Sequence, residues 1–310
     1  MKTITIPTPS IQRQRLHGIL LIALGATAFS AKSILIKLAY EASAEVDAIT
    51  LMTLRMLIAL PFFLGAALWR GKTASSRHRA GDWVALILLG FTGYYLASLL
   101  DFLGLERISA GLERLILFLY PTFVVLFGAL LHRRGVSRSQ RLALLLSYAG
   151  IALVYITQTV GTSSDIGLGA LLVLASALAY AIYLTAAGHY IPRFGARRFT
   201  AWSMSLACGM TIAHFLLTRP LAGLNVPANV LALGGALALF STVLPAFLMN
   251  AGIRRIGADH AAIVGTIGPV STLVLAWAVL GERLHAAQIF GAAMVLGGVL
   301  VVSLTKEQKA

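Results

Sequence analysis

Charge is scarce in this chain. Only 12% of its 310 residues are Asp, Glu, Lys or Arg, about half the share of an average soluble protein. A soluble fold needs a charged exterior, and a mean hydropathy of +0.86 leaves too little polar surface to build one. The composition therefore excludes a water-soluble globular protein and indicates an integral membrane protein.

Cysteine and catalytic motifs are almost absent. The single cysteine, Cys208, excludes an internal disulfide and a cysteine metal cluster. The chain has no His-Glu-x-x-His pair, no Gly-x-Ser-x-Gly elbow and no Walker loop. We therefore expect neither an enzyme nor a protein with a metal or cofactor. The net charge of +14 would suit nucleic acid, but the cations lie in short turns between apolar runs, which predicts a lipid bilayer as partner instead.

The chain contains ten apolar runs of about 20 residues, the length that crosses a bilayer as a helix. The expected spans are 17–40, 47–69, 83–103, 109–131, 140–158, 167–188, 198–218, 229–251, 258–280 and 287–304. The first run imitates a signal peptide, but its apolar character continues to Tyr40, so we expect an uncleaved span. Residues 1–16 and 305–310 are expected to be cytoplasmic tails.

The positive charges orient these spans. With the N-terminus inside, 18 of the 25 Lys and Arg residues fall in inner segments and 3 fall in outer loops. Cytoplasmic loops carry the excess of Lys and Arg. The pattern predicts an all-α, multi-pass protein of the bacterial inner membrane with both ends in the cytoplasm.

Part of the chain occurs twice. Residues 104–154 align without gaps to the stretch that starts at Gly252, at a constant offset of 148, so that Gly104 matches Gly252 and Pro121 matches Pro269. Gly18 similarly begins a run that resembles the one at Gly169. We expect two repeats of five helices, 17–158 and 167–304. An odd number of helices inverts the second repeat, which is a transporter architecture.

The repeated segments carry a recognisable pattern. The residues that form it are the Gly-Glu turn at Glu282, followed by Gln288, Gly291 and Gly298; Arg55 and Ala59 in the second span; and Lys37 at the end of the first span. The pattern resembles the EamA-type family of the drug/metabolite transporter superfamily along nearly the whole chain. The resemblance implies a transporter with a central cavity lined by both halves and with peripheral helices at 140–158 and 287–304.

Ionisable residues inside membrane spans are costly, so they face a cavity or pair with one another. Five of them fall in the outer half of the first repeat: Lys32, Arg55, Asp101, Glu113 and Arg114. Three cations against two carboxylates leave one positive charge, which favours binding of an anionic group such as a substrate carboxylate. The alternative is that the five only tie helices together, with Arg55 pairing with Asp101 or Glu113.

The second repeat offers neutral polar and aromatic groups, which suit the uncharged part of a small organic molecule. The candidates, with one residue from the first repeat, are Tyr94, Tyr180, Tyr183, Trp202, Thr242 and Asn250. The aromatic ones can equally be packed or face lipid. Pro121 and Pro269 are expected inside helices, where each removes a backbone hydrogen bond and can serve as a hinge or shape the cavity. Small residues such as Gly297 allow close helix contact and a homodimer.

The sequence thus predicts a secondary transporter that moves a small metabolite, amino-acid-like or otherwise carboxylate-bearing, by alternating access and in the direction of export. Proton exchange at Asp101 or Glu113 would couple transport to the gradient. Efflux of cationic drugs by the same fold is one alternative. A lipid flippase, or an accessory membrane subunit without its own transport, is another.

Overall fold

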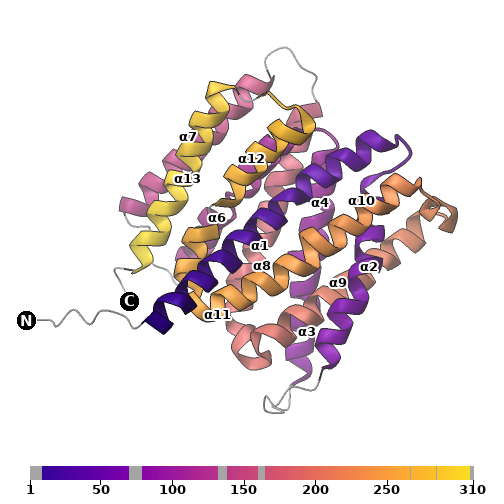
Figure 1. The fold of residues 1–310 in the computed structure, drawn as a ribbon, viewed down its shortest axis with the longest axis horizontal. Coiled ribbons are helices and arrows are strands. Elements are labelled where there is room, and N and C mark those ends of the chain that lie inside the picture. The colour runs from indigo at the N-terminus through magenta and orange to yellow at the C-terminus, as the bar shows by residue number, and fades with distance from the viewer. Residues whose placement is uncertain are drawn as a thin grey trace, which may run out of the picture.

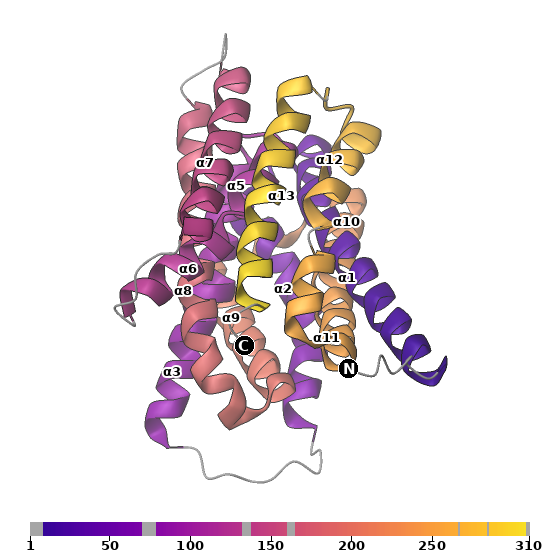
Figure 2. The same cartoon turned by 90° about the vertical axis from the view of Figure 1, so that its left-hand side faces the viewer.

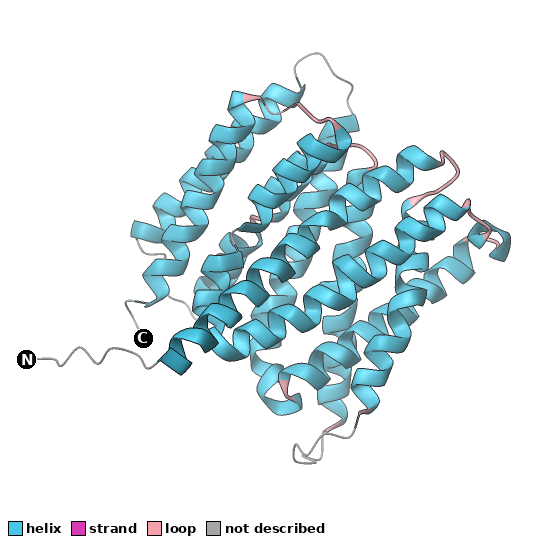
Figure 3. Ribbon diagram, viewed as in Figure 1, coloured by secondary structure: helices cyan, strands magenta, loops and turns pink. Residues whose placement is uncertain are grey.

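The computed structural model describes residues 9–69, 79–131, 138–159, 165–265, 267–283 and 285–307. Throughout these ranges the secondary structure is helical, joined by short turns, and no strand occurs (Figure 3). Long apolar runs adopt helices because a helix satisfies every backbone hydrogen bond within itself, which a bilayer requires. The predicted all-α fold is confirmed.

The described residues of the first half form seven α-helices and one π-helical segment. They are α1 (Pro9–Ala42), α2 (Ala48–Leu68), α3 (Ala80–Gly90), η1 (Phe91–Leu96), α4 (Ala97–Leu105), α5 (Ala110–Leu117), α6 (Tyr120–Leu131) and α7 (Arg138–Thr159). The segment η1 joins α3 to α4 without a turn, so the three form one rod.

The second half follows the same plan. Its elements are α8 (Asp165–Phe194), α9 (Ala196–Thr218), the short 3-10 helix η2 (Leu221–Leu224), α10 (Ala228–Ala238), the π-helix η3 (Leu239–Val243), α11 (Leu244–Gly265), α12 (Ile267–Leu280) and α13 (Ala286–Glu307). Here η3 joins α10 to α11 as η1 joins α3 to α4.

Seven helical stretches in the described residues are long and apolar enough to cross a membrane. Three shorter apolar helices are Leu144–Ile156, Ile267–Leu280 and Ala286–Gly298. Each of the ten overlaps one expected span, and the ten-span topology stays a prediction.

Several helices extend beyond their expected bounds. Helix α1 already includes Pro9, the first described residue, and so extends into the segment expected to be a tail. Helix α11 continues past Arg254 and Arg255, where a turn was expected, because arginine is a good helix former. At the far end α13 reaches Glu307 rather than residue 304.

Helices from the two halves lie side by side. Figure 1 shows α1 running along α10 and α11, and α13 running beside α7. In Figure 2 the beginning of α1 and the end of α13 point towards the lower part of the molecule, while the connection from α12 to α13 lies at the opposite end.

Glycines allow close contacts between helices of the two halves. A Cβ atom on Gly252 of α11 would lie 3.0 Å from the carbonyl oxygen of Gly18 in α1, and one on Gly104 of α4 would lie 3.0 Å from that of Gly169 in α8. Under the repeat these are equivalent crossings, because Gly104 matches Gly252 and Gly18 matches Gly169. Each crossing therefore brings the backbones of two helices, one from each half, together at glycine.

The two π-helical segments also occupy equivalent positions, since Phe91 and Leu239 are 148 residues apart. Within each, a threonine hydroxyl donates to a backbone carbonyl: Thr92 to Leu88 at 3.0 Å and Thr242 to Leu237 at 2.9 Å. π-Helical turns leave carbonyl groups less well paired and are frequent at functional sites.

Pro121, which was predicted to lie inside a helix, lies instead in a first turn. It is the second residue of α6, after a break at Phe118 and Leu119. Proline lacks an N–H and fits the first turn, where that donor has no intrahelical acceptor. Pro269 lies in α12, and residue 266 before that element lies outside the described residues. A hinge role for either proline stays a prediction.

Candidate functional site

A cluster of buried charges lies where α1, α4 and α5 meet. Lys32 of α1 places its Nζ atom 2.5 Å from Oδ2 of Asp101 in α4 and 3.5 Å from Oε1 of Glu113 in α5. None of the three side chains is more than 7% exposed. One ammonium group thus serves two carboxylates in a space closed to water.

Two serines of α1 extend the cluster. Ser33 donates to Oε2 of Glu113 at 2.6 Å. Ser30 accepts from Nη2 of Arg114 at 3.4 Å and donates to the Gly268 carbonyl of α12 at 2.8 Å. Because α12 belongs to the second half, both halves contribute groups to this site.

Aromatic rings cover the remaining cations. The guanidinium of Arg114 lies 5.1 Å from the centre of the Phe29 ring. That of Arg55 in α2 lies 4.7 Å from the centre of the Phe102 ring. Phe102 neighbours Asp101 in sequence, so Arg55 flanks the cluster without an ion pair to either carboxylate within 4 Å in the described chain. The alternative in which Arg55 pairs with Asp101 or Glu113 does not occur among the described residues, where Lys32 contacts both carboxylates.

The charges in this cluster do not balance. Among the described residues, Lys32, Arg55 and Arg114 face two carboxylates, those of Asp101 and Glu113, and all five residues are at most 5% exposed. Nε and Nη2 of Arg55 and Nε of Arg114 are buried without a hydrogen-bond acceptor, and Oδ1 of Asp101 and Oε1 of Glu113 are buried without a hydrogen-bond donor. Buried donors without partners are rare in native proteins and mark strain or a binding role.

Four tyrosines form a second cluster beside the charges. The hydroxyls of Tyr94 in η1 and Tyr183 in α8 lie 2.8 Å apart. Tyr180 stacks on Tyr183 with ring centres 5.7 Å apart, and Tyr120 of α6 meets Tyr180 edge-on at 5.1 Å. Arg114 lies within electrostatic range of Tyr120 and Tyr180. The tyrosines therefore continue the polar interior from the charged cluster towards α3 and α8.

The other predicted site residues have different surroundings. Trp202 of α9 packs against the same apolar cluster as Tyr94, Tyr180 and Tyr183, meets Trp83 edge-on at 5.7 Å and lines a surface groove. The Thr242 hydroxyl donates to the Leu237 carbonyl of its own helical segment. The side chain of Asn250 lies outside the described residues. The structure thus brings together the five charged residues and, beside them, the three predicted tyrosines with Trp202.

Sequence reasoning missed three kinds of contributor: Ser30 and Ser33, Tyr120, and the role of Glu282. The Glu282 carboxylate accepts from the backbone N–H groups of Ala110 at 2.8 Å and Gly111 at 3.3 Å, and so caps the start of α5. Glu282 therefore fixes the start of α5, the helix that carries Glu113 and Arg114. The Gly-Glu turn was visible in the sequence, but a turn motif does not show which helix it reaches.

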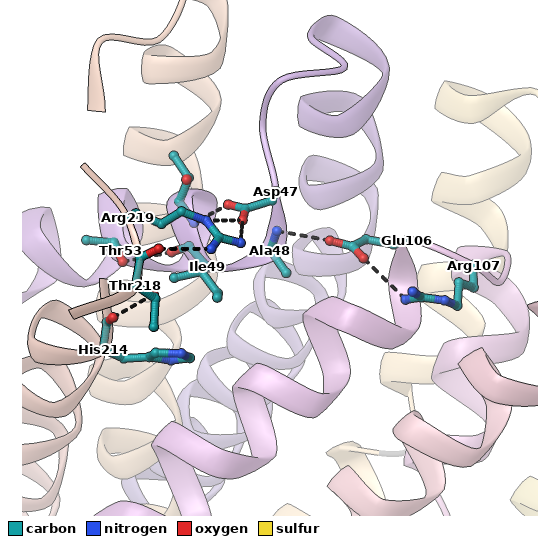
Figure 4. A network of polar contacts seen from close by, with 10 residues as sticks. Asp47, Ala48, Ile49, Thr53, Glu106, Arg107, His214, Thr218 and Arg219 are labelled. Carbon is teal, nitrogen blue, oxygen red and sulfur yellow. Dashed lines mark hydrogen bonds and ion pairs between the residues drawn. The ribbon is translucent and has the colours of Figure 1, made fainter. Parts of the chain in front are cut away.

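An exposed polar network closes one end of the molecule beyond the cluster. Asp47 caps α2 through the Thr50 N–H and accepts from Nε of Arg219, after α9, at 2.8 Å (Figure 4). Glu106 accepts from the Ala48 N–H at 3.0 Å. Partial burial of Asp47 raises its pKa, but the bonds from Thr50 and the charge of Arg219 outweigh this and hold the pKa below its ordinary value. The network ties the first half to the second.

Beside this network lies a pocket of about 280 Å³ lined by Tyr40, Asp47 and Glu106 among others. The Tyr40 hydroxyl donates to the Phe102 carbonyl at 3.1 Å, so this tyrosine separates the pocket from the charged cluster. Among the described residues no group of three or more His, Cys, Asp or Glu side chains is arranged to hold a metal ion.

A family model, the EamA-like transporter family, matches this chain at residues 16–156 and again at 167–304. The chain belongs to the EamA-like transporter family. It is therefore a membrane transporter of the drug/metabolite transporter superfamily and not an enzyme. The resemblance to the EamA-type family is confirmed.

Individual relatives agree with this assignment. The EamA-like chain is 33% identical to the uncharacterized transporter YcbK of Bacillus subtilis over 94% of this chain and 92% of YcbK. It is 27% identical to the uncharacterized inner membrane transporter YicL of Salmonella typhimurium over 74% of this chain and 76% of YicL. A crystal structure with 20% identity has a TM-score of 0.62 over 94% of this chain and 96% of the other, which shows a shared fold.

Proposed function

We propose that this EamA-like transporter moves a small organic anion, a carboxylate-bearing metabolite, and exports it by alternating access. The observation that carries the proposal is the excess of cations in the buried cluster. Three buried cations lie against two carboxylates, and Arg55 and Arg114 keep buried N–H groups without acceptors.

An unmatched buried cation is expensive, because it loses its hydration and gains no partner. A substrate carboxylate that reaches Arg114 or Arg55 supplies the missing negative charge and accepts from the free N–H groups. Guanidinium groups suit this role because their fork of donors matches the two oxygens of a carboxylate. A cationic substrate would add to the excess, which argues against drug efflux by this chain.

The tyrosine cluster supports an organic substrate rather than an inorganic anion. Tyr120 and Tyr180 lie within electrostatic range of Arg114, and Tyr180 stacks on Tyr183, whose hydroxyl lies 2.8 Å from that of Tyr94. Rings with hydroxyl groups bind the uncharged part of a metabolite through apolar contact and occasional hydrogen bonds.

We further propose ten spans in two inverted five-helix halves, with both ends in the cytoplasm of a bacterial cell. Support comes from the paired crossings of Gly18 with Gly252 and of Gly104 with Gly169, and from the two π-helices 148 residues apart. The excess of Lys and Arg in the inner segments supports the orientation. With α1, α4 and α5 on one side of the site and α12 on the other, movement of one half against the other exposes the cluster to either side.

A ligand panel tests the anion proposal. The purified protein in neutral detergent is heated with amino acids, hydroxy acids and keto acids, each beside its uncharged amide. At least one acid is expected to raise the melting temperature of the wild type while its amide does not. Arg114→Gln is expected to lose that rise. The control Arg107→Gln removes an arginine whose side chain is 32% exposed and is expected to keep it. A response to amides and acids alike would contradict the proposal.

Proton coupling is assigned to Glu113 rather than Asp101. Asp101 lies 2.5 Å from Lys32, whereas Glu113 lies 3.5 Å from it and depends on the neutral Ser33 for its other oxygen. The less neutralised carboxylate is the one that exchanges a proton more readily. Glu113→Gln is expected to remove the pH dependence of transport into vesicles of an acid that the panel identifies. A profile identical to that of the wild type would contradict this role.

Labelling tests the topology separately. Single cysteines replace Asp165 at the start of α8 and Ala196 at the start of α9, in a Cys208→Ala background. A membrane-impermeant maleimide on intact cells is expected to label Asp165→Cys and to label Ala196→Cys only after lysis. Labelling of both positions from the same side would contradict the proposed arrangement.

A further inference from the structure

An apolar groove runs along the surface between α2 and α9, away from the charged cluster. It has a volume of about 490 Å³, and its lining includes Leu60, Leu64, Leu206, Gly209 and Met210. Ser205 also lines it but already donates to the Ala201 carbonyl at 2.8 Å, so its hydroxyl seeks no other partner. The groove therefore offers contact to a hydrocarbon chain and little to a polar ligand.

One end of the groove carries the residues expected at a membrane–water interface. Trp69 follows α2 and is 68% exposed, and Trp83 meets the groove residue Trp202 edge-on. Arg197, at the start of α9, donates to the Trp69 carbonyl at 3.3 Å and lies 5.9 Å from the centre of its ring. Tryptophans gather at the headgroup level of a bilayer. The groove thus starts at that level and continues into the hydrocarbon region.

Arginines at this end are available to an anion. Neither Arg197 nor Arg198 makes an ion pair within the part of the chain that the structure describes, and Arg197 is exposed. Nearby Arg193 is different, because Asp82 accepts from it at 2.7 Å. Basic side chains at the membrane surface attract anionic headgroups by about 1 kcal/mol each.

We propose that this groove is a binding site for one anionic phospholipid. The phosphate contacts Arg197 and Arg198, the glycerol region packs on Trp69, and one acyl chain fills the groove beside Gly209. The groove joins a basic, tryptophan-lined end to an apolar body in the order that headgroup and tail have in a lipid. The groove shares no lining residue with the charged cluster, so the lipid site stands whether or not the anion proposal holds.

The experiment measures lipid binding by native mass spectrometry and by thermal shift of the full chain in neutral detergent. The probes are phosphatidylglycerol and phosphatidylcholine with identical acyl chains, and glycerol phosphate without chains. Phosphatidylglycerol is expected to bind and raise the melting temperature. Phosphatidylcholine is expected to do so far less, and glycerol phosphate not at all. Equal effects of the two lipids would overturn the proposal, as would an equal effect of glycerol phosphate.

One pair of variants tests the acyl chain. A Cβ atom on Gly209 meets nothing within 4 Å, so Gly209→Leu extends into the groove without a backbone clash. Gly188 in α8 is equally open but does not line the groove, so Gly188→Leu is the matched control. Gly209→Leu is expected to lose the shift caused by phosphatidylglycerol, and Gly188→Leu is expected to keep it. A full shift in Gly209→Leu would overturn the placement of the chain.

A second pair tests the headgroup. The double variant Arg197→Gln, Arg198→Gln is expected to bind phosphatidylglycerol about thirtyfold more weakly. The control Arg254→Gln, Arg255→Gln removes the same charge from α11, where Arg255 donates to the Ala251 carbonyl, and is expected to bind as the wild type does. Equal weakening in both double variants would show a general effect of net charge and overturn the site.

Discussion

Replacing Lys32 by methionine removes the one cation that serves both buried carboxylates. Methionine keeps the length and apolar stem of lysine, so the change is chiefly one of charge. The Lys32 side chain is 7% exposed and that of Asp101 3%, and water therefore does not compensate for the loss. Removing one member of a buried ion pair typically costs about 3–5 kcal/mol.

Proton uptake sets an upper limit on this cost. The Asp101 carboxylate of the variant avoids a buried charge by binding a proton, which at pH 7 costs an ordinary aspartate about 4 kcal/mol. The same protonation costs about 1.5 kcal/mol at pH 5. We therefore expect Lys32→Met to be destabilised by about 3–4 kcal/mol at pH 7 and by clearly less at pH 5.

The assay is the free energy of unfolding in mixed micelles at the two pH values. The double variant Lys32→Met, Asp101→Leu is expected to recover about 2 kcal/mol, because it buries no uncompensated charge at that position. Arg107→Met, which removes the exposed partner of Glu106, is the comparison and is expected to cost less than about 1 kcal/mol. If Lys32→Met were no more destabilised than Arg107→Met, or if its loss did not depend on pH, the buried pairing would be refuted.

Three further outcomes are expected. The pKa of Asp47 is lowered in the fold, so its pairing with Arg219 stabilises the fold above about pH 4 and is lost as the pH falls through the folded-state pKa. The melting temperature of Asp47→Asn should therefore depend less on pH than that of the wild type between about pH 5 and 3. The effect should be below about 1 kcal/mol because the pair is partly exposed. Gly252→Ala should cost about 1–3 kcal/mol by crowding the helix crossing, whereas Gly65→Ala, whose Cβ meets open space, should be neutral or slightly stabilising in the same unfolding assay. Glu282→Ala should lose about 1–2 kcal/mol with the cap of α5, and a cost equal to zero would contradict that contact.

The sequence predicts the helices well because membrane helices follow from a simple condition. About 20 apolar residues are needed to cross the hydrocarbon core, and each candidate span stands out against the scarce charges. Helix ends are less predictable, since α1 and α11 continue beyond the apolar runs. Proline positions were visible, but whether Pro121 bends a helix or begins one depends on how α6 packs.

Membership of the candidate site was also largely visible. Buried charges are rare in spans, so Lys32, Asp101 and Glu113 were identified by rarity alone. The sequence did not show which of these residues contact one another, because that depends on the rotation of α1 about its axis relative to α4. That rotation is set by side-chain packing at crossings such as Gly18 with Gly252, and a repeat pattern does not specify it.

The neutral aromatic candidates for the site were harder to predict, because helix rotation again decides where each side chain points. Tyr180 and Tyr183 lie one turn apart and reach the interior together, whereas Trp202 lies on α9 and lines the surface groove. A large aromatic residue suits the interior, a helix contact and the membrane interface equally well. Only the orientation of the helix distinguishes these cases.

The most direct test of anion transport compares the metabolites that cells release into the medium. Cells expressing the wild type are compared with cells expressing Arg114→Gln at an equal level of membrane protein, with Arg107→Gln as the control. We predict that the compounds released by the wild type and the control, but not by Arg114→Gln, bear a carboxylate or another anionic group. Release of cationic compounds, or an unchanged set of compounds from Arg114→Gln, would contradict the assignment of the buried cluster as the substrate site.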